Sequence, residues 1–564
     1  MGTITINPDD LAATRTNLGL GTASTLNTGT ANGNVPVVGS DGKLSASILP
    51  ASGGSVTATA SGAIAAGKCV ILNSNGTVSE ISATSISHAV GSDYTQSGET
   101  AAELNQLVYD TTDNHFIWGG KNTISGSTAG RVYALDMNSS LAISEAAPPA
   151  AAGGLDAAAW SATYDETLQR SIFHGSNSSN YVRAHTVNVV SGAMKVSPSI
   201  NWKNSNYPYG FTRGFDADEL MVAYQSASTT LRMAFVDITK GSDASGDSFS
   251  GFTSEIDPDE LDATSTWNAH YSQIVPFPLV SKFLIGHFGN LSGNRSFEFA
   301  IGSVGGSSGG SRTFSQDMKG IFTSTGVSTT AVAASVDPVG FSQAGRVEYD
   351  ATKDRAFVFD SEFLYSISVD SNGVASMSQL ERIQANANTA NFFTMKSIPN
   401  SDHLVCFFAS QANSNRSSYR VATFNKGATA AQDTFTVGSE VEINTNAVAL
   451  SYTPVAYSPD VDAFMIKEYR SGSAQPFYGV RVGRTTTNVK PSGTDARYLG
   501  VAKSSVSNGQ SVEISVTGSV ATMASGGMSV GTTFFVQNDG SVGTTDRNFG
   551  TAGVAVSATQ LLLE

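Results

Sequence analysis

The chain contains 564 residues, and 32 basic residues against 47 acidic ones give it a formal net charge of −15. Binding to nucleic acid or to an anionic membrane surface requires clusters of Lys and Arg, and the sequence has no such cluster, so neither partner is expected. Only 14% of the residues are charged, whereas 56 are glycine, which favours short strands and turns over helices. The sequence therefore predicts a mostly β protein, and its length predicts two to four domains.

The first residues, MGTITINPDD, contain no basic region followed by an apolar run, so no signal peptide is predicted. No apolar run reaches the roughly 20 residues that cross a bilayer. We therefore expect a protein that is made in a cytoplasm and is not inserted into a membrane. Its two cysteines, Cys69 and Cys406, each lie in an apolar, strand-like run, which predicts two buried free thiols and no disulfide.

A short helix is predicted over residues 7–18, because Asn7 can cap it and Gly19 can end it. Leu11 and Leu18 lie on one face of this helix at helical spacing. One short helix cannot bury such a face alone. It therefore needs partners, and copies of itself are candidates.

The following residues carry LGLG at 18–21, Val35-Pro36, DGKL at 41–44 and Leu49-Pro50, in this order. This succession, within residues 15–50, resembles a segment common in the tail fibres of tailed bacteriophages. In such fibres the segment lies in an intertwined, trimeric shaft. The resemblance implies a virion tail protein made in the host cytoplasm, bound through its amino terminus to other tail or baseplate proteins. It also implies a homotrimer, with Leu11, Leu18 and Leu20 as trimerisation residues.

The sequence contains an internal duplicate at an offset of 464 residues. GKCVILNSNGTV at 67–78 aligns without gaps on GTTFFVQNDGSV at 531–542. Each copy is a strand followed by an Asn-Gly or Asp-Gly turn, which is a hairpin signal. We therefore predict that the two copies are halves of one small β-domain and that the residues between them are an insertion.

A second repeat lies within that insertion. Each unit has an anchor residue that ends one strand, then a polar turn, then two more apolar strands. The seven anchors are Tyr109, Tyr164, Phe215, Phe277, Tyr349, Ile398 and Tyr457. Acidic residues follow several anchors and are predicted to form the turns: Asp110, Asp165, Asp216 and Asp350.

A single sheet of three or four strands cannot cover both of its faces, whereas copies arranged around an axis can. The predicted fold is therefore a β-propeller of about seven blades inserted in a small split β-domain, after a short helix and an extended, shaft-like segment. Six or eight blades and a β-helix are the alternatives. The predicted domains are an attachment and trimerisation segment (1–54), the first part of the split domain (55–95), the propeller (96–490) and the second part (491–564).

The densest acidic run is EIDPDELD at 255–262. It can be a solvated loop, a Ca²⁺ site that uses Asp257, Asp259 and Asp262, or a set of catalytic carboxylates, and the solvated loop is the preferred interpretation. None of the seven histidines forms an HxH or HExxH pattern, and no phosphate-binding loop or nucleophile elbow is present. We therefore predict a protein that is not an enzyme and needs no cofactor, with Ca²⁺ as the candidate ion.

Aromatic residues in two polar connections between blades are the remaining functional signal. Such rings can stack on sugars, and binding residues favour loops on a rigid scaffold. The alternative is that the rings pack between blades. The candidate receptor-binding residues are Trp202, Tyr207, Tyr209, Trp267, His270 and Tyr271.

The expected function is therefore attachment of a phage to its host, with the propeller loops binding a host cell-surface glycan. A structural fibre or baseplate component without receptor contact, and a glycan-degrading depolymerase, are the two alternatives.

Overall fold

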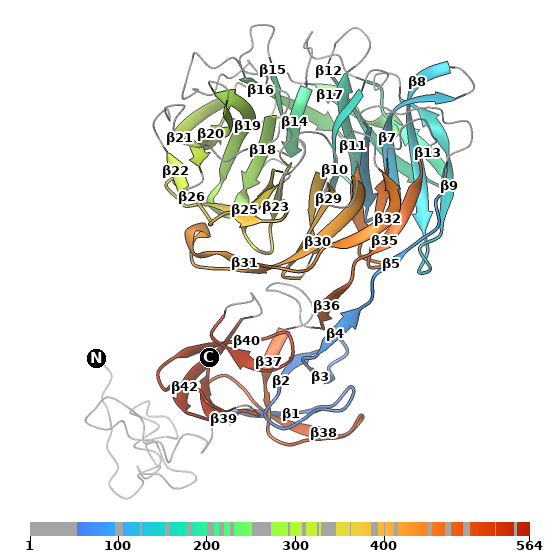
Figure 1. Cartoon of the computed structure of the whole chain (residues 1–564). Helices are drawn as coiled ribbons and strands as arrows, with labels where there is room; N and C mark the ends of the chain where they lie inside the picture. The colour runs from blue at the N-terminus through green and yellow to red at the C-terminus, as the bar shows by residue number, and fades with distance from the viewer. Residues whose placement is uncertain are drawn as a thin grey trace, which may run out of the picture. The chain divides into compact units, whose positions relative to one another are not determined.

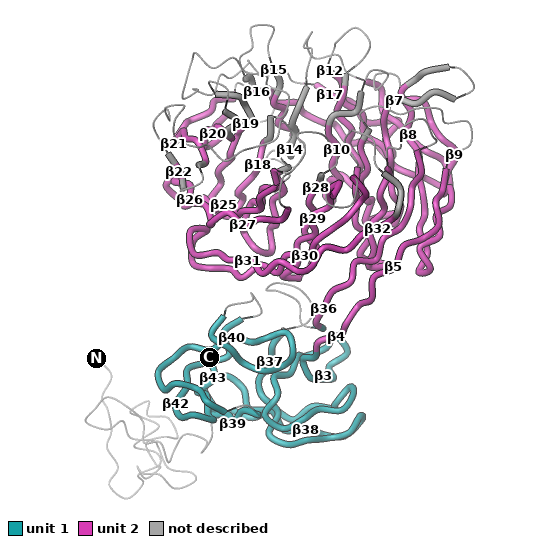
Figure 2. The backbone as a smooth tube through the Cα atoms, viewed as in Figure 1, with its two compact units in different colours: residues 1–82, 488–490, 494–564 teal, residues 83–487, 491–493 magenta. Residues whose placement is uncertain are grey.

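The computed structural model describes residues 54–95, 105–124, 127–152, 158–176, 182–199, 208–213, 219–225, 231–250, 272–291, 294–306, 312–323, 326–328, 346–360, 362–384, 393–399, 401–410, 415–447, 454–468, 475–488, 497–524, 526–545 and 550–564. The chain forms two compact units (Figure 2). Unit 1 is Met1–Ser82 with Asn488–Lys490 and Thr494–Glu564, and unit 2 is Ala83–Thr487 with Pro491–Gly493. Within the described ranges, all regular elements are β-strands or short 3₁₀ turns, as the composition predicts. The predicted helix at residues 7–18 and the residues Leu11, Leu18 and Leu20 lie outside these ranges.

Unit 2 is a seven-bladed β-propeller (Figure 1), which confirms the predicted fold class and blade count. Each blade is an antiparallel sheet whose first strand contacts the first strands of its two neighbours. The ring is closed because β33 (Val455–Ser458) of the last blade contacts β6 (Asn105–Asp110) of the first.

The first four blades follow one another in the chain. Blade 1 contains β6, β7 (His115–Ile124), β8 (Ser127–Met137) and β9 (Ile143–Ala151). Blade 2 contains β10 (Ala158–Asp165), β11 (Arg170–Ser176), β12 (Val182–Val190) and β13 (Ala193–Val196). Blade 3 contains β14 (Pro208–Arg213), β15 (Glu219–Gln225), β16 (Leu231–Thr239), the 3₁₀ turn η2 (Ala244–Gly246) and β17 (Ser248–Ser250). Blade 4 contains β18 (Ser272–Phe277), η3 (Pro278–Val280), β19 (Lys282–Leu291), β20 (Asn294–Gly305), β21 (Thr313–Thr323) and β22 (Gly326–Ser328).

The last three blades complete the ring. Blade 5 contains β23 (Arg346–Asp350), β24 (Arg355–Phe359), β25 (Phe363–Val369), β26 (Ala375–Met377) and β27 (Glu381–Arg382). Blade 6 contains β28 (Phe393–Ser397), β29 (His403–Ser410), β30 (Arg416–Asn425), η5 (Ala430–Gln432), β31 (Thr434–Val437) and β32 (Val441–Ala447). Blade 7 contains β33, β34 (Ala463–Lys467), β35 (Phe477–Arg481) and β5 (Ala89–Val90).

The outermost strand of blade 7 comes from the beginning of unit 2. Val90 pairs with Val480, and Ala89 pairs with Arg481. Just before β5, strand β4 (Ala83–Ile86) pairs with β36 (Arg484–Thr487) in a two-stranded ribbon. Residues 83–95 therefore belong with the propeller, and the predicted boundary at 95/96 moves to 82/83. The predicted boundary at 490/491 lies outside the described residues.

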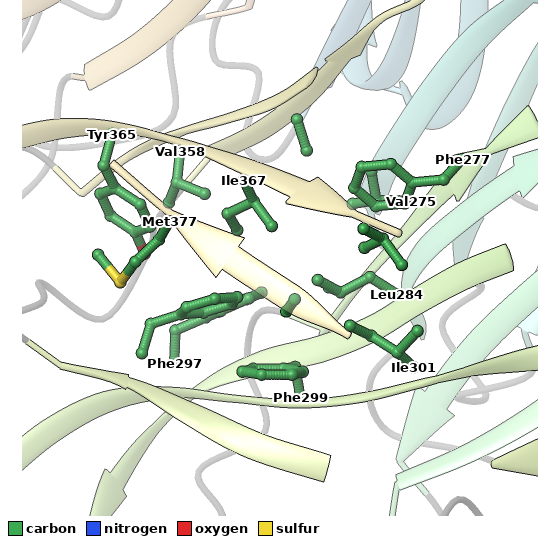
Figure 3. Packing of buried hydrophobic residues seen from close by; sticks show 14 residues of the cluster. Val275, Phe277, Leu284, Phe297, Phe299, Ile301, Val358, Tyr365, Ile367 and Met377 are labelled. Atoms are coloured by element: carbon green, nitrogen blue, oxygen red, sulfur yellow. The ribbon is translucent and has the colours of Figure 1, made fainter. Parts of the chain in front are cut away.

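The cores lie between neighbouring blades, because each blade covers a face of the next. All five residues of β24, RAFVF, are buried. Figure 3 shows one such core, where Phe297 and Ile301 of blade 4 lie beside Val358 and Ile367 of blade 5. Strands that are buried on both faces have continuous apolar runs instead of strict alternation.

Unit 1 consists of two five-stranded sheets. Sheet 1 has the strand order β1 (Ser55–Thr59), β38 (Ser511–Ser515), β37 (Arg497–Ala502), β2 (Cys69–Leu72) and β3 (Val78–Glu80). Sheet 2 has the strand order β39 (Val520–Thr522), β43 (Gln560–Leu563), β42 (Thr551–Ser557), β40 (Thr533–Val536) and β41 (Val542–Gly543). The propeller is inserted between β3 and β37 of sheet 1.

The predicted duplicate is present in the registers of both sheets. Leu72 pairs with Val78 in sheet 1, and Val536 pairs with Val542, each 464 positions later, in sheet 2. Both copies lie in unit 1, as predicted, each in a sheet of its own. The predicted extent of the insertion needs a correction, because β37 and β38 lie between the two copies in the sequence and belong to sheet 1.

A bulge interrupts both sheets at the same place, and a glycine lies at each bulge. Gly500 has φ +156° and Gly553 has φ +152°. A Cβ at Gly500 would lie 1.9 Å from the carbonyl oxygen of Ser515, and one at Gly553 would lie 2.0 Å from that of Leu562. Both positions therefore require glycine for the close approach of the next strand.

We expect the Gly500→Ala substitution to lower the free energy of unfolding of unit 1 by about 1–3 kcal/mol or more, because strand β38 must move away from the new methyl group. Hydrogen exchange of the amides in β37 and β38 measures the effect. Gly526→Ala is the control, since a Cβ there meets no heavy atom closer than 3.4 Å. Equal protection in the two variants would contradict the steric role of Gly500.

Candidate functional site

The antiparallel blades give the propeller two faces with different connections. We call the end of the blades where first strands join second strands the turn face, and the opposite end the loop face. The turn face has short connections such as 111–114 and 351–354, and the β4–β36 ribbon leaves from it because β36 directly follows β35. The loop face has the connections from one blade to the next, and these include 251–271 and 329–345.

On the turn face, the acidic residues that follow the anchors form the turns, as predicted. Oδ1 of Asp110 accepts hydrogen bonds from the amides of Thr112 and Asp113, at 2.9 and 3.1 Å. Asp165 and Asp350 cap their turns in the same way. Asp216 lies outside the described residues. These carboxylates are therefore structural.

The tyrosine anchors hold the same turns. Tyr349 donates to Asp354 at 2.8 Å, and Tyr109 of blade 1 donates to Asp460 of blade 7 at 2.7 Å. Burial, with the nearby carboxylates, raises the pKa of both phenols above the usual value of 10. The phenols remain neutral donors at physiological pH, so Tyr349 holds the turn of its own blade and Tyr109 holds the turn of the neighbouring blade 7.

Two buried ion pairs join neighbouring blades with the same geometry. Nε of Arg170 in blade 2 lies 2.9 Å from Oδ2 of Asp247 in blade 3, and Nε of Arg355 in blade 5 lies 2.7 Å from Oδ2 of Asp433 in blade 6. Each carboxylate also accepts a hydrogen bond of 2.7 Å from a hydroxyl of the blade that carries the arginine. The donor is Thr186 for Asp247 and Ser366 for Asp433. Each aspartate lies in the connection between the third and fourth strands of its blade. The ion pair therefore holds this connection against the preceding blade.

These pairs were not predicted, although the loops share a pattern. KGSDASGDSF at 240–249 and KGATAAQDTF at 426–435 have Lys, Gly, Ala, Asp and Phe at matching positions. In each loop the glycine amide donates to the aspartate Oδ1 at 2.7 Å. Blade 4 reverses the charges at its junction with blade 3, because Arg312 pairs with Glu219 there. The shared loop pattern therefore indicates a contact between neighbouring blades and not a ligand site.

We expect Asp433→Ala to lower the free energy of unfolding of unit 2 by about 3–5 kcal/mol, because it leaves Arg355 buried without its carboxylate. The double variant Arg355→Met/Asp433→Leu removes both charges and should recover most of this loss. Thermal unfolding followed by calorimetry measures both. A double variant as unstable as Asp433→Ala would show that loop packing, and not the charge, decides the result.

Asp360 and Glu468 are buried carboxyl groups in described parts of loop-face connections, and the pKa of Asp360 is shifted. Asp360 is fully buried between β24 and β25, and its Oδ1 accepts hydrogen bonds from the amides of Glu362 and Phe363 at 2.9 and 2.6 Å. Burial raises the pKa of Asp360 from 3.8 to about 7, although the two amides act in the opposite direction. This group therefore titrates close to neutral pH.

Because the folded pKa lies above the unfolded value, the folded state binds a proton that the unfolded state has released between about pH 4 and 7. The free energy of unfolding should fall as the pH rises through this window. The Asp360→Asn side chain keeps an oxygen that accepts from the two backbone amides, but it carries no charge. We therefore expect this variant to melt at a higher temperature than the native chain at pH 8, but not at pH 4. Asp370→Asn, at an exposed turn with similar amide hydrogen bonds, is the control. Parallel pH curves for the Asp360 variant and the native chain would contradict the assignment.

Five of the six predicted receptor-binding residues belong to two connections of the loop face. Trp202 and Tyr207 precede β14, and Trp267, His270 and Tyr271 precede β18. These five residues lie outside the described residues. Tyr209 lies within β14, at an irregularity where Pro208 pairs with Tyr224 and Gly210 with Ala223. One connection runs from β13 to β14 and the other from β17 to β18, and all four of these strand ends lie at the loop face.

The candidate metal ligands Asp257, Asp259 and Asp262 also lie outside the described ranges. Among the residues that the structure describes, no group of three or more His, Cys, Asp or Glu side chains is placed to hold a metal ion. The two cysteines are buried and free, as predicted. No helix in the described ranges has the length and hydropathy needed to span a lipid bilayer.

Comparison with known proteins gives fold neighbours only. No family model and no curated protein matches the chain. A 6-phosphogluconolactonase-like protein from Bacteroides uniformis is 12% identical, with a TM-score of 0.38 over 68% of this chain and 95% of its own. A protein from Lactobacillus plantarum is 11% identical, with a TM-score of 0.41 over 63% of this chain and 89% of its own. Neither likeness indicates an activity for this chain.

Proposed function

We propose that the chain is a bacteriophage tail fibre protein and that the loop face of its propeller binds a glycan on the host cell surface. The phage assignment is supported by the resemblance of residues 15–50 to tail-fibre segments. The receptor role is supported by one observation about the blades. Both connections that carry the candidate aromatic residues join strand ends at the loop face, away from the ribbon that leads to unit 1.

The chemistry of these connections suits a sugar. Trp202 and Trp267 offer flat apolar rings, and Asn, Lys and Ser neighbours in NWKNSN offer hydrogen bonds for hydroxyl groups. Single sugar sites bind weakly, so a homotrimer, which the resemblance implies, would gain affinity when several sites bind one surface at once. Ca²⁺ is part of the proposal only as a candidate ion for Asp257, Asp259 and Asp262 in the second connection.

The test uses the full chain, fluorescently labelled, on cells from a panel of bacterial strains. We expect binding to at least one strain, and a loss of about tenfold or more in affinity for Trp202→Ala or Trp267→Ala, as for central aromatic residues of other binding surfaces. Leu279→Ala is the matched control, because Leu279 is 73% exposed on the turn face. Binding that both tryptophan variants retain would remove these connections from the proposal.

The same strains separate the two alternatives. Purified surface polysaccharide from a bound strain is incubated with the chain, and new reducing ends are measured. No release together with binding is the result expected of a receptor-binding protein. Released oligosaccharide would overturn the non-enzymatic role and favour a depolymerase, and absence of binding across strains that the phage infects would favour a structural fibre component.

A further inference from the structure

A short strap closes the loop-face end of blade 5. After the fourth strand of this blade the chain returns to the loop face, where β27 pairs with the beginning of β25. The amides of Ile383 and Gln384 then donate to the carbonyl oxygen of Glu362, at 2.8 and 3.4 Å. We call residues 381–384 the strap. The connection to blade 6 follows the strap in the sequence.

The strap covers part of an apolar core. Ile383 is fully buried, in one cluster with Phe359 and Leu364 of blade 5 and with residues of blade 6. On the outside, Arg382 forms an ion pair with Glu362, and 55% of the arginine side chain is exposed. Ion pairs with such exposure stabilise a structure only slightly. The strap therefore depends on Ile383 and on the position of the Glu362 carbonyl group.

Asp360 holds the residue to which the strap is bound. Its Oδ1 accepts from the amides of Glu362 and Phe363, and its own amide donates to the carbonyl oxygen of Phe363 at 3.1 Å. Its Oδ2 is buried and has no hydrogen-bond partner among the residues that the structure describes. A buried carboxylate without such partners is costly, whereas the neutral carboxyl group costs much less. The closed strap therefore favours the protonated form of Asp360.

The charged groups around Asp360 do not offset its negative charge. Glu362 has the same sign and raises the pKa of Asp360 further, and burial keeps the phenol of Tyr365 neutral by raising its pKa well above 10. The face of blade 4 that packs on blade 5 is apolar in the described ranges. The other charged residues at this end of blades 5 and 6 are Glu381 and Arg382 of the strap, Arg346 in β23, and Arg416 and Glu442 of blade 6. Arg382 is paired with Glu362, Arg416 is paired with Glu442, and Arg346 is in register with Phe359.

We propose that Asp360 is a pH-dependent latch, which keeps the strap closed while its carboxyl group is protonated and lets the strap open locally when the group is ionised. Opening exposes the carboxyl group to water, where it ionises at its ordinary pKa of 3.8, whereas the pKa in the closed state is about 7. The open population should therefore rise about tenfold per pH unit between about pH 4 and 7 and stay level above this range. The open strap uncovers Phe359 and Leu364 at the loop face. The latch does not depend on receptor binding.

The test measures hydrogen exchange of the full chain at pH 5 and pH 7 by mass spectrometry, with each rate divided by the intrinsic rate at that pH. The native chain is compared with Asp360→Asn, which has no proton to lose at this position. For the peptide that contains Ile383, we expect the native-to-variant ratio of exchange rates to rise at least about tenfold from pH 5 to pH 7. The strap should also exchange faster than β29 of blade 6, which shows that the opening is local.

Two further variants make the result specific. Asp370→Asn, at an exposed turn of the same blade, should exchange at the strap like the native chain. Glu362→Gln removes the negative charge that raises the pKa of Asp360, so the rise in strap exchange from pH 5 to pH 7 should be smaller than in the native chain. A ratio that stays the same at the two pH values would overturn the latch. So would a strap that exchanges as slowly as β29 at pH 7, because it would then open only with the whole unit.

Discussion

A small β-sheet is stable only when its apolar faces are covered and its edge strands are paired, and no blade of this chain meets either condition alone. Neighbouring blades cover each other's faces, which is why strands such as Arg355–Phe359 are buried along their whole length. The ring must therefore close, which it does where β33 contacts β6, and residues 89–94 complete the last blade. Ala89 and Val90 pair with β35, and Tyr94 forms a bridge with Phe477.

The buried charges follow from the same requirement. Where a long connection crosses to the preceding blade, an arginine and an aspartate fix it through several hydrogen bonds, and this happens at two junctions with almost the same atoms. The turn-face tyrosines act in a similar way over shorter distances. The buried arginine–aspartate pairs and the tyrosine contacts described above therefore lie at the turn face of the propeller.

Much of this fold could be predicted because its signals are local. The anchors and the apolar second strands recur in each blade, Asp-capped turns recur in several, and the 464-residue offset identifies two equivalent hairpins. Strand β5 could not be predicted, since two residues of ordinary composition carry no pattern and their partner lies 390 positions later. The loop pattern around Asp247 and Asp433 is visible in the sequence, but its role depends on an arginine from another blade. For the candidate site, the sequence indicated the connections and residue types, and the fold adds which strand ends they join.

The ribbon of β4 and β36 has a mechanical consequence. The chain enters unit 2 through Ala83–Ile86 and leaves it through Arg484–Thr487, and the two segments are paired residue by residue. A pulling force between the units is therefore shared by two covalent backbones that run side by side. The hydrogen bonds between them lie across the direction of pull, and none has to break for the tension to pass. Such a tether can bear load while the last blade of the ring stays intact.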